Sequence, residues 1–327
     1  MEEKKERKEV RSKRISKEEM GELTKKIDGE LERFIKEGKY KDVLIMMGNL
    51  GRYSLNNQIY IVMQNPSAKT VHGMRQWNRL GRHVIPGEKA IRIFSPILVK
   101  KDKEKTDGEE NEKGYVCRGF KLGYVFDLSQ TEGKEISAFR FDEEKLVKEK
   151  DGILEGLRKM VGDKGYSIRY ASKEELGDGC YGLCNHATKE IKILEGMGDL
   201  QEISTTVHEC GHALAHSGYR EDFEGLTPHE KREIKEVEAE SIACVVCTHL
   251  GLDTKDFNFS YITGWAEGDI KKFRKNLDVI SDHARTLIDG IEKELSSEKE
   301  KASSEEGTIP LPRWIPEKEK PSSVVME

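Results

Sequence analysis

The sequence predicts a mixed α+β protein with two folded domains between charged ends. A chain of 327 residues has room for two domains of ordinary size. Two hydrophobic patterns alternate along it: apolar residues at helical spacing, as in 17–37, and short alternating runs typical of strands, as in 189–194. Charged residues form 36% of the chain and crowd both ends. We therefore expect disordered charged tails at 1–17 and 296–327 around domains at 18–142 and 143–295.

The N-terminal domain is predicted to mix helices and strands. Gly38 and Pro66 are expected to end two of its helices, because glycine favours a helix C-terminus and proline disfavours helix in the residue before it. The expected elements are helices at 17–37, 40–47 and 54–65, a short helix after residue 71, two strands joined by Pro86-Gly87, a charged insert at 102–114, a strand at 119–127 and a linker at 134–142.

The second domain begins near Glu143. Its pattern alternates long helical segments with short strands, and a loop rich in glycine and cysteine precedes the last strand. The expected elements are a helix at 143–160, a strand at 166–170, a loop at 177–185, a strand at 189–194, helices around 204–216 and at 230–250, an aromatic segment at 257–265 and a last helix at 269–295.

The most informative motif is His208-Glu209-Cys210-Gly211-His212. Two histidines four residues apart on a helix place their imidazoles one turn apart on the same face. This H-E-x-x-H spacing lets two neutral imidazoles bind Zn²⁺ while the glutamate accepts a proton from a zinc-bound water. The alternative is a core helix whose histidines are merely hydrogen-bonded.

A third zinc ligand is expected on the next helix, because a catalytic zinc takes three protein ligands and keeps one position for water. Glu236 is the best candidate, and the segment resembles the Glu-x-x-x-Asp/Asn pattern of gluzincin peptidases. Glu240 lies one turn further on and could orient a zinc-bound histidine. We expect Glu238 to project elsewhere into solvent. His216 is interpreted as an ordinary residue near the helix end rather than a ligand.

Six cysteines in a chain of this length do not indicate a disulfide framework. The pairs Cys180/Cys184 and Cys244/Cys247 could together bind a structural zinc. Neither pair has the turn-like setting of a zinc knuckle, so small buried thiols are the favoured interpretation.

A basic segment dominates the first domain. Residues 69–101 contain eight lysines and arginines, a single acidic residue, Glu88, and the aromatic Trp77. Cations along a backbone and an aromatic face for base stacking are what single-stranded DNA requires. A solvated basic face with Trp77 in the core explains the pattern equally well. The expected DNA contacts are Asn56, Asn57, Gln58, Arg75, Trp77, Arg79, Arg82, Lys89 and Arg92.

No apolar run is long enough to span a membrane, and the first residues lack a signal-peptide core. We therefore predict a cytoplasmic protein without a membrane partner.

Two parts of the chain resemble a known family. Tyr53-Ser-Leu-Asn-Asn-Gln-Ile, the segment from Trp77 to Ile91, and Val125-Phe-Asp-Leu-Ser-Gln-Thr-Glu-Gly resemble the N-terminal single-stranded-DNA-binding domain of ArdC-type antirestriction proteins. The later segments around His208 and Glu236 look like the zincin domain of ArdC and ImmA/IrrE metallopeptidases. The resemblance spans about residues 20–295 and implies an accessory protein of a mobile element.

The resemblance also implies zinc at His208, His212 and Glu236, with Glu209 as general base. Glu240 departs from the Asn or Asp often found at its position, so its role is less well defined by the family. In gluzincin-like folds an edge strand beside the zinc helix pairs with an extended peptide, and 189–194 is the candidate.

The sequence thus predicts a single-stranded-DNA-binding domain followed by a zinc peptidase acting on an unidentified protein or peptide. One alternative is a DNA-binding decoy with structural zinc. Another is an ImmA-like anti-repressor protease whose N-terminal domain binds protein. Candidates for stabilising the oxyanion are Tyr219, His229 and Tyr261.

Overall fold

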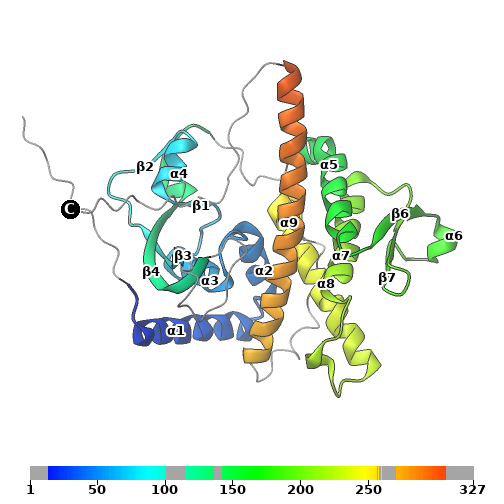
Figure 1. Cartoon of the computed structure of the whole chain (residues 1–327), viewed down its shortest axis with the longest axis horizontal. Coiled ribbons are helices and arrows are strands. Elements are labelled where there is room, and N and C mark those ends of the chain that lie inside the picture. Colours follow the sequence, from blue (N-terminus) through cyan, green and yellow to red (C-terminus); the bar gives the residue numbers. More distant parts are fainter. Residues whose placement is uncertain are drawn as a thin grey trace, which may run out of the picture.

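The computed structural model describes residues 14–100, 115–135, 142–255, 257, 259 and 270–306. Residues 1–13, the whole insert at 102–114, the centre of the linker, most of the aromatic segment 257–265 with Tyr261, and residues 307–327 lie outside this range, together with the expectations placed on them. The described chain is mixed α+β, as predicted, and forms helices on both sides of the long central helix α9 (Figure 1).

The N-terminal region combines helices with two small sheets. Ser16 caps its first helix, where its hydroxyl accepts from the Glu19 backbone N–H and the Glu19 carboxylate accepts from the Ser16 N–H. The helices are α1 (Lys17–Lys36), α2 (Tyr40–Asn49), α3 (Leu55–Gln64) and α4 (Met74–Arg79), and the strands are β1 (Val71–His72), β2 (Arg82–Val84), β3 (Ile91–Lys100), β4 (Tyr115–Asp127) and β5 (Thr131–Gly133), the last two joined by the short 3-10 turn η1 (Leu128–Gln130).

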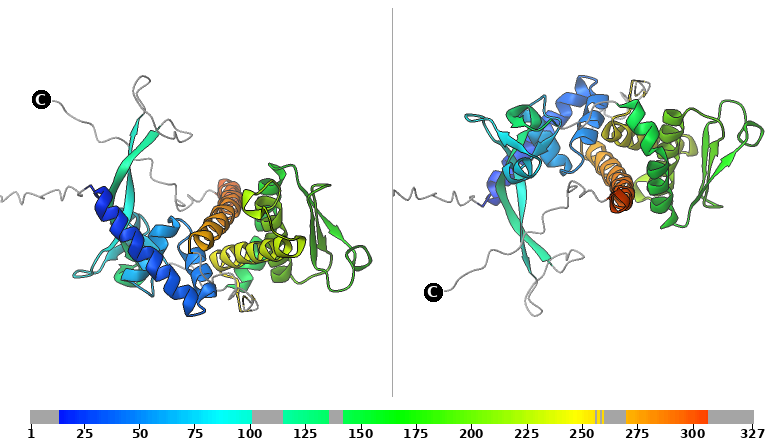
Figure 2. Two further views of the ribbon diagram at one scale, coloured as in Figure 1. Left: turned by 90° about the horizontal axis from the view of Figure 1, so that it is seen from below. Right: turned by 90° about the horizontal axis from the view of Figure 1, so that it is seen from above.

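The two strands expected on either side of Pro86-Gly87 do not pair with each other as a hairpin. β2 pairs with β5, whereas β3 pairs with β4, which also pairs with β1. β3 and β4 form a long antiparallel arm that extends away from α1–α3 (Figure 2). The two strands on either side of Pro86-Gly87 therefore belong to different sheets.

The second region places a small sheet against one side of a helical layer. Its helices are α5 (Glu143–Gly162), α6 (Lys173–Leu176), α7 (Asp199–Ala215), α8 (Pro228–Leu250) and α9 (Ile270–Glu306), its strands are β6 (Ser167–Ala171), β7 (Gly182–Asn185) and β8 (Glu190–Leu194), and the 3-10 turn η2 (Glu221–Phe223) precedes α8. The last helix continues to Glu306, so the segment 296–306, expected to be part of a disordered tail, is helical.

One hydrophobic core runs through both regions. Helix α2 packs directly on α8, with Gly48 so close to Thr248 that an added Cβ would lie 2.6 Å from the threonine Cβ. The Tyr40 and Ser241 hydroxyls hydrogen-bond across this contact at 2.7 Å. The N-terminal helices thereby support the back of α8.

None of the helices in the described part of the chain is both long and apolar enough to cross a membrane.

Candidate metal centre and nucleic-acid surface

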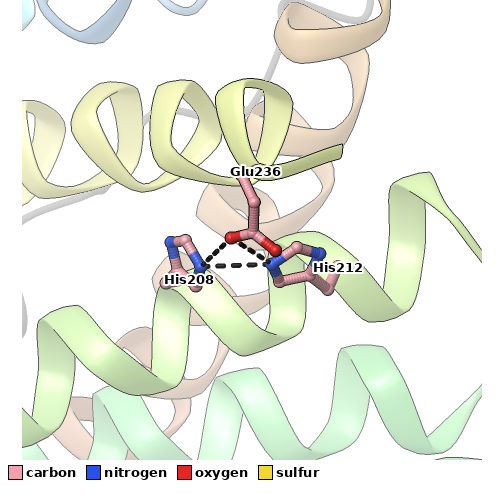
Figure 3. A group of neighbouring side chains, drawn as sticks. All are labelled: His208, His212 and Glu236. Carbon is pink, nitrogen blue, oxygen red and sulfur yellow. Dashed lines mark hydrogen bonds and ion pairs between the residues drawn. The ribbon is translucent and has the colours of Figure 1, made fainter. Parts of the chain in front are cut away.

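Two adjacent helices bring three potential metal ligands together. His208 and His212 lie one turn apart on α7, and Glu236 reaches them from α8 (Figure 3). The two Nε2 atoms are 3.1 Å apart, and a Glu236 carboxylate oxygen lies 3.7 Å from His208 Nε2 and 3.4 Å from His212 Nε2. This is the one group of this kind that the described residues form, and its ligand atoms lie within 4.8 Å of one another.

The spacing of these atoms suits a tetrahedral cation. Ligands held about 2.0–2.1 Å from zinc lie roughly 3.3 Å from each other. Two imidazole nitrogens and one carboxylate oxygen are also the donor set of many catalytic zinc sites. The residues present therefore fit a divalent metal of the zinc type.

Electrostatics also favours a cation at this position. Although burial disfavours its charge, hydrogen bonds to Glu236 and Glu240 raise the pKa of His208 to about 10. Hydrogen bonds from the two histidines lower the pKa of Glu236 well below its usual range. Without a metal, the carboxylates thus hold a proton on His208, and a bound cation would take over that positive charge.

Glu240 is placed where it can orient a ligand. Its carboxylate lies 3.2 Å from His208 Nδ1, the ring nitrogen that faces away from the cluster. An N–H donated from Nδ1 to this carboxylate leaves Nε2 free to bind a metal. Glu236 therefore lies within the cluster, whereas Glu240 lies behind the His208 ring.

Glu209 is buried beside the cluster on α7. Burial raises the pKa of its carboxyl group, and the charges of His208 and His212 partly offset that effect. A carboxylate with a raised pKa next to a metal site is suited to accept and return a proton near neutral pH.

Gly182 on β7 is a site residue that the sequence analysis missed. A Cβ at this position would lie 2.7 Å from both Cγ and Oε1 of Glu209 and 2.9 Å from Thr205 Cγ2. Only glycine lets strand β7 approach the Glu209 carboxylate this closely. The glycine-rich loop at 177–185 was the available signal.

The prediction that Glu238 is solvated is wrong. Its side chain is 0% exposed and accepts hydrogen bonds from Arg220. Its carboxylate also lies 3.0 Å from His216 Nε2, and His216 Nδ1 lies 3.1 Å from His212 Nδ1. The α8 helix turns Glu238 toward the loop after α7, where Arg220 compensates its charge.

This chain of contacts positions His212. Burial lowers the pKa of His216 to about 4, so its ring is neutral near pH 7. A neutral His216 that donates from Nε2 to Glu238 can accept the Nδ1–H of His212 at its own Nδ1. His212 is then held with Nε2 directed at the cluster. His216 is not part of the ligand cluster, as expected, but it has a role beyond ending a helix.

A cleft of about 920 Å³ opens over the cluster. One wall is the segment 179–186, which includes β7, and the other is the first half of α8. The prediction that residues 189–194 form the peptide shelf is wrong, because β8 is the central strand and pairs on both sides with β6 and β7. The edge strand at the cleft is β7.

The cysteines form no metal cluster within the described residues. Cys244 and Cys247 are buried free thiols, as the favoured interpretation predicts, and burial raises the pKa of each to about 12. Cys180 and Cys184 are half-buried and line the cleft.

The oxyanion candidates do not line the cleft in the described part of the chain. Tyr219 is 80% exposed and its hydroxyl donates to Glu224. The His229 side chain is also exposed and lies near Glu233. The positions of Tyr219 and His229 therefore do not favour either residue as the group that stabilises the oxyanion.

In the N-terminal region, the structure corrects the expected contacts of Trp77 and two amides. Trp77 is 0% exposed, and its indole N–H donates to the Phe126 carbonyl at 2.9 Å, so its ring has no free face for a base. Asn57 is buried and bonds both backbone groups of Phe94. Gln58 is buried and donates to the carbonyls of Leu50 and Tyr53.

Asn56 is half-buried, and its carbonyl oxygen accepts from Arg274 of α9. The amides that follow Ser54 are therefore used to hold α3 against its neighbours. Asn57 and Gln58 bond backbone groups and Asn56 bonds the Arg274 side chain, so these amides have partners inside the protein.

Four of the five expected cations are on the surface. Arg75, Arg79, Lys89 and Arg92 are exposed. Arg82 is half-buried, and its guanidinium donates to Thr131 and to the Lys134 carbonyl, so it holds β2 against β5.

Exposed aromatic rings occur elsewhere in this region. Tyr124 is 49% exposed and Phe120 is 39% exposed, both on β4. Tyr124 lies directly opposite Arg92 of β3 in the strand register. The hydrophobic pattern of 119–127 predicts a strand but does not show that Phe120 and Tyr124 of this strand are exposed to solvent.

Comparison with known proteins gives a family match for the first third of the chain. Residues 13–126 match the model of the N-terminal domain of anti-restriction factor ArdC. An uncharacterized protein of Bacillus anthracis is 25% identical over 291 residues, which cover 78% of this chain and 48% of the relative. The chain thus spans about half the length of that curated relative.

Crystal structures of the antirestriction protein ArdC from plasmid R388 are similar at low sequence identity. The metal-free structure shares 17% identity, with 74% of this chain and 85% of that chain covered and a TM-score of 0.40. The Mn(II)-bound structure shares 16% identity, with 73% and 87% covered and a TM-score of 0.39.

Proposed function

We propose that this protein is a metal-dependent peptidase whose N-terminal region binds single-stranded DNA, and that it acts in antirestriction. The observation that carries the enzymatic part is the placement of Glu209. It is a buried carboxylate directly beside the cluster of His208, His212 and Glu236, and it borders an open cleft. The antirestriction context comes from the family match of residues 13–126.

The ligand set favours zinc. His208 and His212 would bind it through Nε2 and Glu236 through a carboxylate oxygen, and Glu240 and His216 hold the two rings in the required orientation. When bound, the cation would activate a water molecule and polarise the scissile carbonyl.

The remaining steps belong to the chain's own groups. The Glu209 carboxylate accepts a proton from the attacking water and later donates a proton to the leaving amine nitrogen. An extended substrate can add to the edge of β7, which runs along the cleft. Gly182 allows this strand to lie against Glu209.

The test compares the zinc-loaded full chain with its Glu209→Gln variant on fluorescently quenched casein. We expect Glu209→Gln to retain zinc and its melting temperature but to lose cleavage, since the proton acceptor is gone. Glu143→Gln, on the exposed start of α5, is the matched control and should cleave normally. Equal cleavage by wild type and Glu209→Gln would refute the peptidase proposal.

The DNA-binding part rests on the exposed cations and on the exposed Tyr124 and Phe120 of the β3–β4 arm. A labelled oligothymidine in fluorescence anisotropy should bind more tightly than a duplex of equal length, because only its bases are free to stack. Antirestriction that survives Glu209→Gln would instead favour a DNA-binding decoy with structural metal. Cleavage of a repressor by a chain that binds no DNA would favour the anti-repressor alternative.

A further inference from the structure

The cleft over the metal cluster has one strongly basic wall. Lys231, Arg232 and Lys235 all line it from α8. Residues three and four apart on a helix share a face, so Arg232 lies one turn before Glu236 on the same face, while Lys231 and Lys235 lie one turn apart on the adjoining face. The three cations therefore lead along the cleft to the metal cluster.

The charge of this wall is not neutralised by neighbouring carboxylates. The acidic residues of the cleft lining are Glu209, Glu236 and Glu240, and all three are engaged at the metal cluster. Across the described ranges, Lys231, Arg232 and Lys235 form no ion pair with a carboxylate. A divalent cation at the cluster would make the cleft more positive still.

An aromatic ring lies beside the side chain of Lys235. Its ammonium lies 5.9 Å from the centre of the Phe223 ring, which supports the side chain from the loop before α8. Burial, followed by the charge of Lys235, lowers the pKa of His186, which lines the other side of the cleft. The positive charge is therefore felt across the space that a substrate would occupy.

The opposite wall favours a polypeptide over a nucleic acid. β7 is an edge strand, and its outer backbone groups can pair with another extended backbone. Such pairing depends little on side-chain identity, so selectivity must come from side-chain contacts across the cleft. Lys231, Arg232 and Lys235 of α8 line the cleft and can make these side-chain contacts.

We propose that Lys231, Arg232 and Lys235 form a binding site for acidic side chains, so that the cleft selects an acidic segment of polypeptide. This inference deepens the proposed peptidase function and rests on it for the reaction, but the binding preference can be measured without cleavage. Three partly exposed charge contacts together correspond to roughly a tenfold preference.

The experiment uses the zinc-loaded full chain carrying Glu209→Gln, so that bound peptide is not cut. A fluorescein-labelled glutamate-rich peptide is compared with a glutamine-rich peptide of equal length by anisotropy. We expect about tenfold tighter binding of the acidic peptide at low salt, weakening as salt is added. Lys231→Gln with Arg232→Gln and Lys235→Gln should abolish this preference.

A matched control removes three lysines that do not line the cleft. Lys145→Gln, Lys148→Gln and Lys293→Gln are exposed changes of the same total charge and should retain the preference. Equal binding of the two peptides, or a preference that survives the cleft substitutions, would overturn the inference. So would oligothymidine that binds the same three cations more tightly than the acidic peptide. An acidic preference without cleavage by the wild type would uphold the site and refute the peptidase function.

Discussion

The metal cluster and the basic surface of the N-terminal region are organised in opposite ways. At the cluster, the ligand atoms of His208, His212 and Glu236 lie at defined distances from one another, and a chain of contacts runs from His212 through His216 to Glu238 and Arg220. The surface cations Arg75 and Lys89 are instead exposed to solvent.

Under the proposed function, this difference would correspond to two kinds of recognition. Preorganised ligands bind a small cation tightly and tolerate little change, because each of them was positioned before binding. Dispersed exposed cations bind a polyanion through counterion release, so each contributes modestly and the sum depends on salt. Substitutions should therefore have large, local effects at the cluster and small, additive effects on the surface.

The largest effect is expected from His212→Ala. Removing one of three protein ligands should abolish stoichiometric zinc binding, since the remaining two give a much weaker site. Metal analysis of the purified variant checks this. His186→Ala, which alters the same cleft without touching the cluster, should keep its zinc. A fully metallated His212→Ala would show that the cluster is not the metal site.

Trp77→Ala should act on stability rather than on DNA contacts directly. The indole is fully buried, and truncating such a side chain typically costs about 3–5 kcal/mol of unfolding free energy. Urea denaturation followed by circular dichroism measures this change. If Trp77→Ala kept wild-type stability while losing DNA binding, the ring would act as a DNA contact rather than as part of the core.

Glu240→Ala should weaken zinc binding without abolishing it. Loss of a carboxylate that orients a metal-binding histidine typically reduces affinity by about 10–100-fold. A competition titration with a chelating dye gives the affinity, and Glu236→Ala provides the comparison, since it should bind no zinc. Exchanged outcomes for the two variants would mean that their roles are reversed.

Tyr124→Ala should weaken single-stranded DNA binding by about 1–3 kcal/mol if its exposed ring stacks on a base. Its melting temperature should barely change, because the side chain is 49% exposed. Tyr181→Ala removes a comparably exposed ring, at 51%, from the second region and should bind DNA normally. An unchanged affinity for Tyr124→Ala would exclude this ring from the interface.

The smallest expected effect is on the salt dependence of DNA affinity. Arg75→Ala with Lys89→Ala should lower the slope of log affinity against log salt by about 1.4, since each lost phosphate contact on a single strand contributes about 0.7. Anisotropy at several salt concentrations measures the slope. The control is Lys145→Ala with Lys148→Ala, on α5. An equal slope for wild type and both double variants would mean that DNA binds another surface.

The helices and most strands could be predicted from the sequence because their signals are local. Ser16 with Glu19, Gly38 and the residue before Pro66 mark helix ends within a few positions of where they occur. Pairing is not local: nothing near Pro86-Gly87 shows that β2 joins β5 while β3 joins β4.

The cluster illustrates what the sequence by itself determined. Once residues 199–215 are helical, the four-residue interval alone places His208 and His212 on one face, one turn apart. The same periodicity on α8 separates Glu236 from Glu240 by one turn, so both could be assigned roles before the fold was known.

Only the tertiary structure decided which polar and aromatic groups are buried. Glu238 resembles a solvated glutamate until Arg220 and His216 are brought against it, and Trp77 resembles a stacking platform until β4 supplies the Phe126 carbonyl. Burial depends on partners that lie far away in the chain, and no local spacing encodes them. Helical periodicity fixes the direction of a side chain, and the fold alone determines what it meets there.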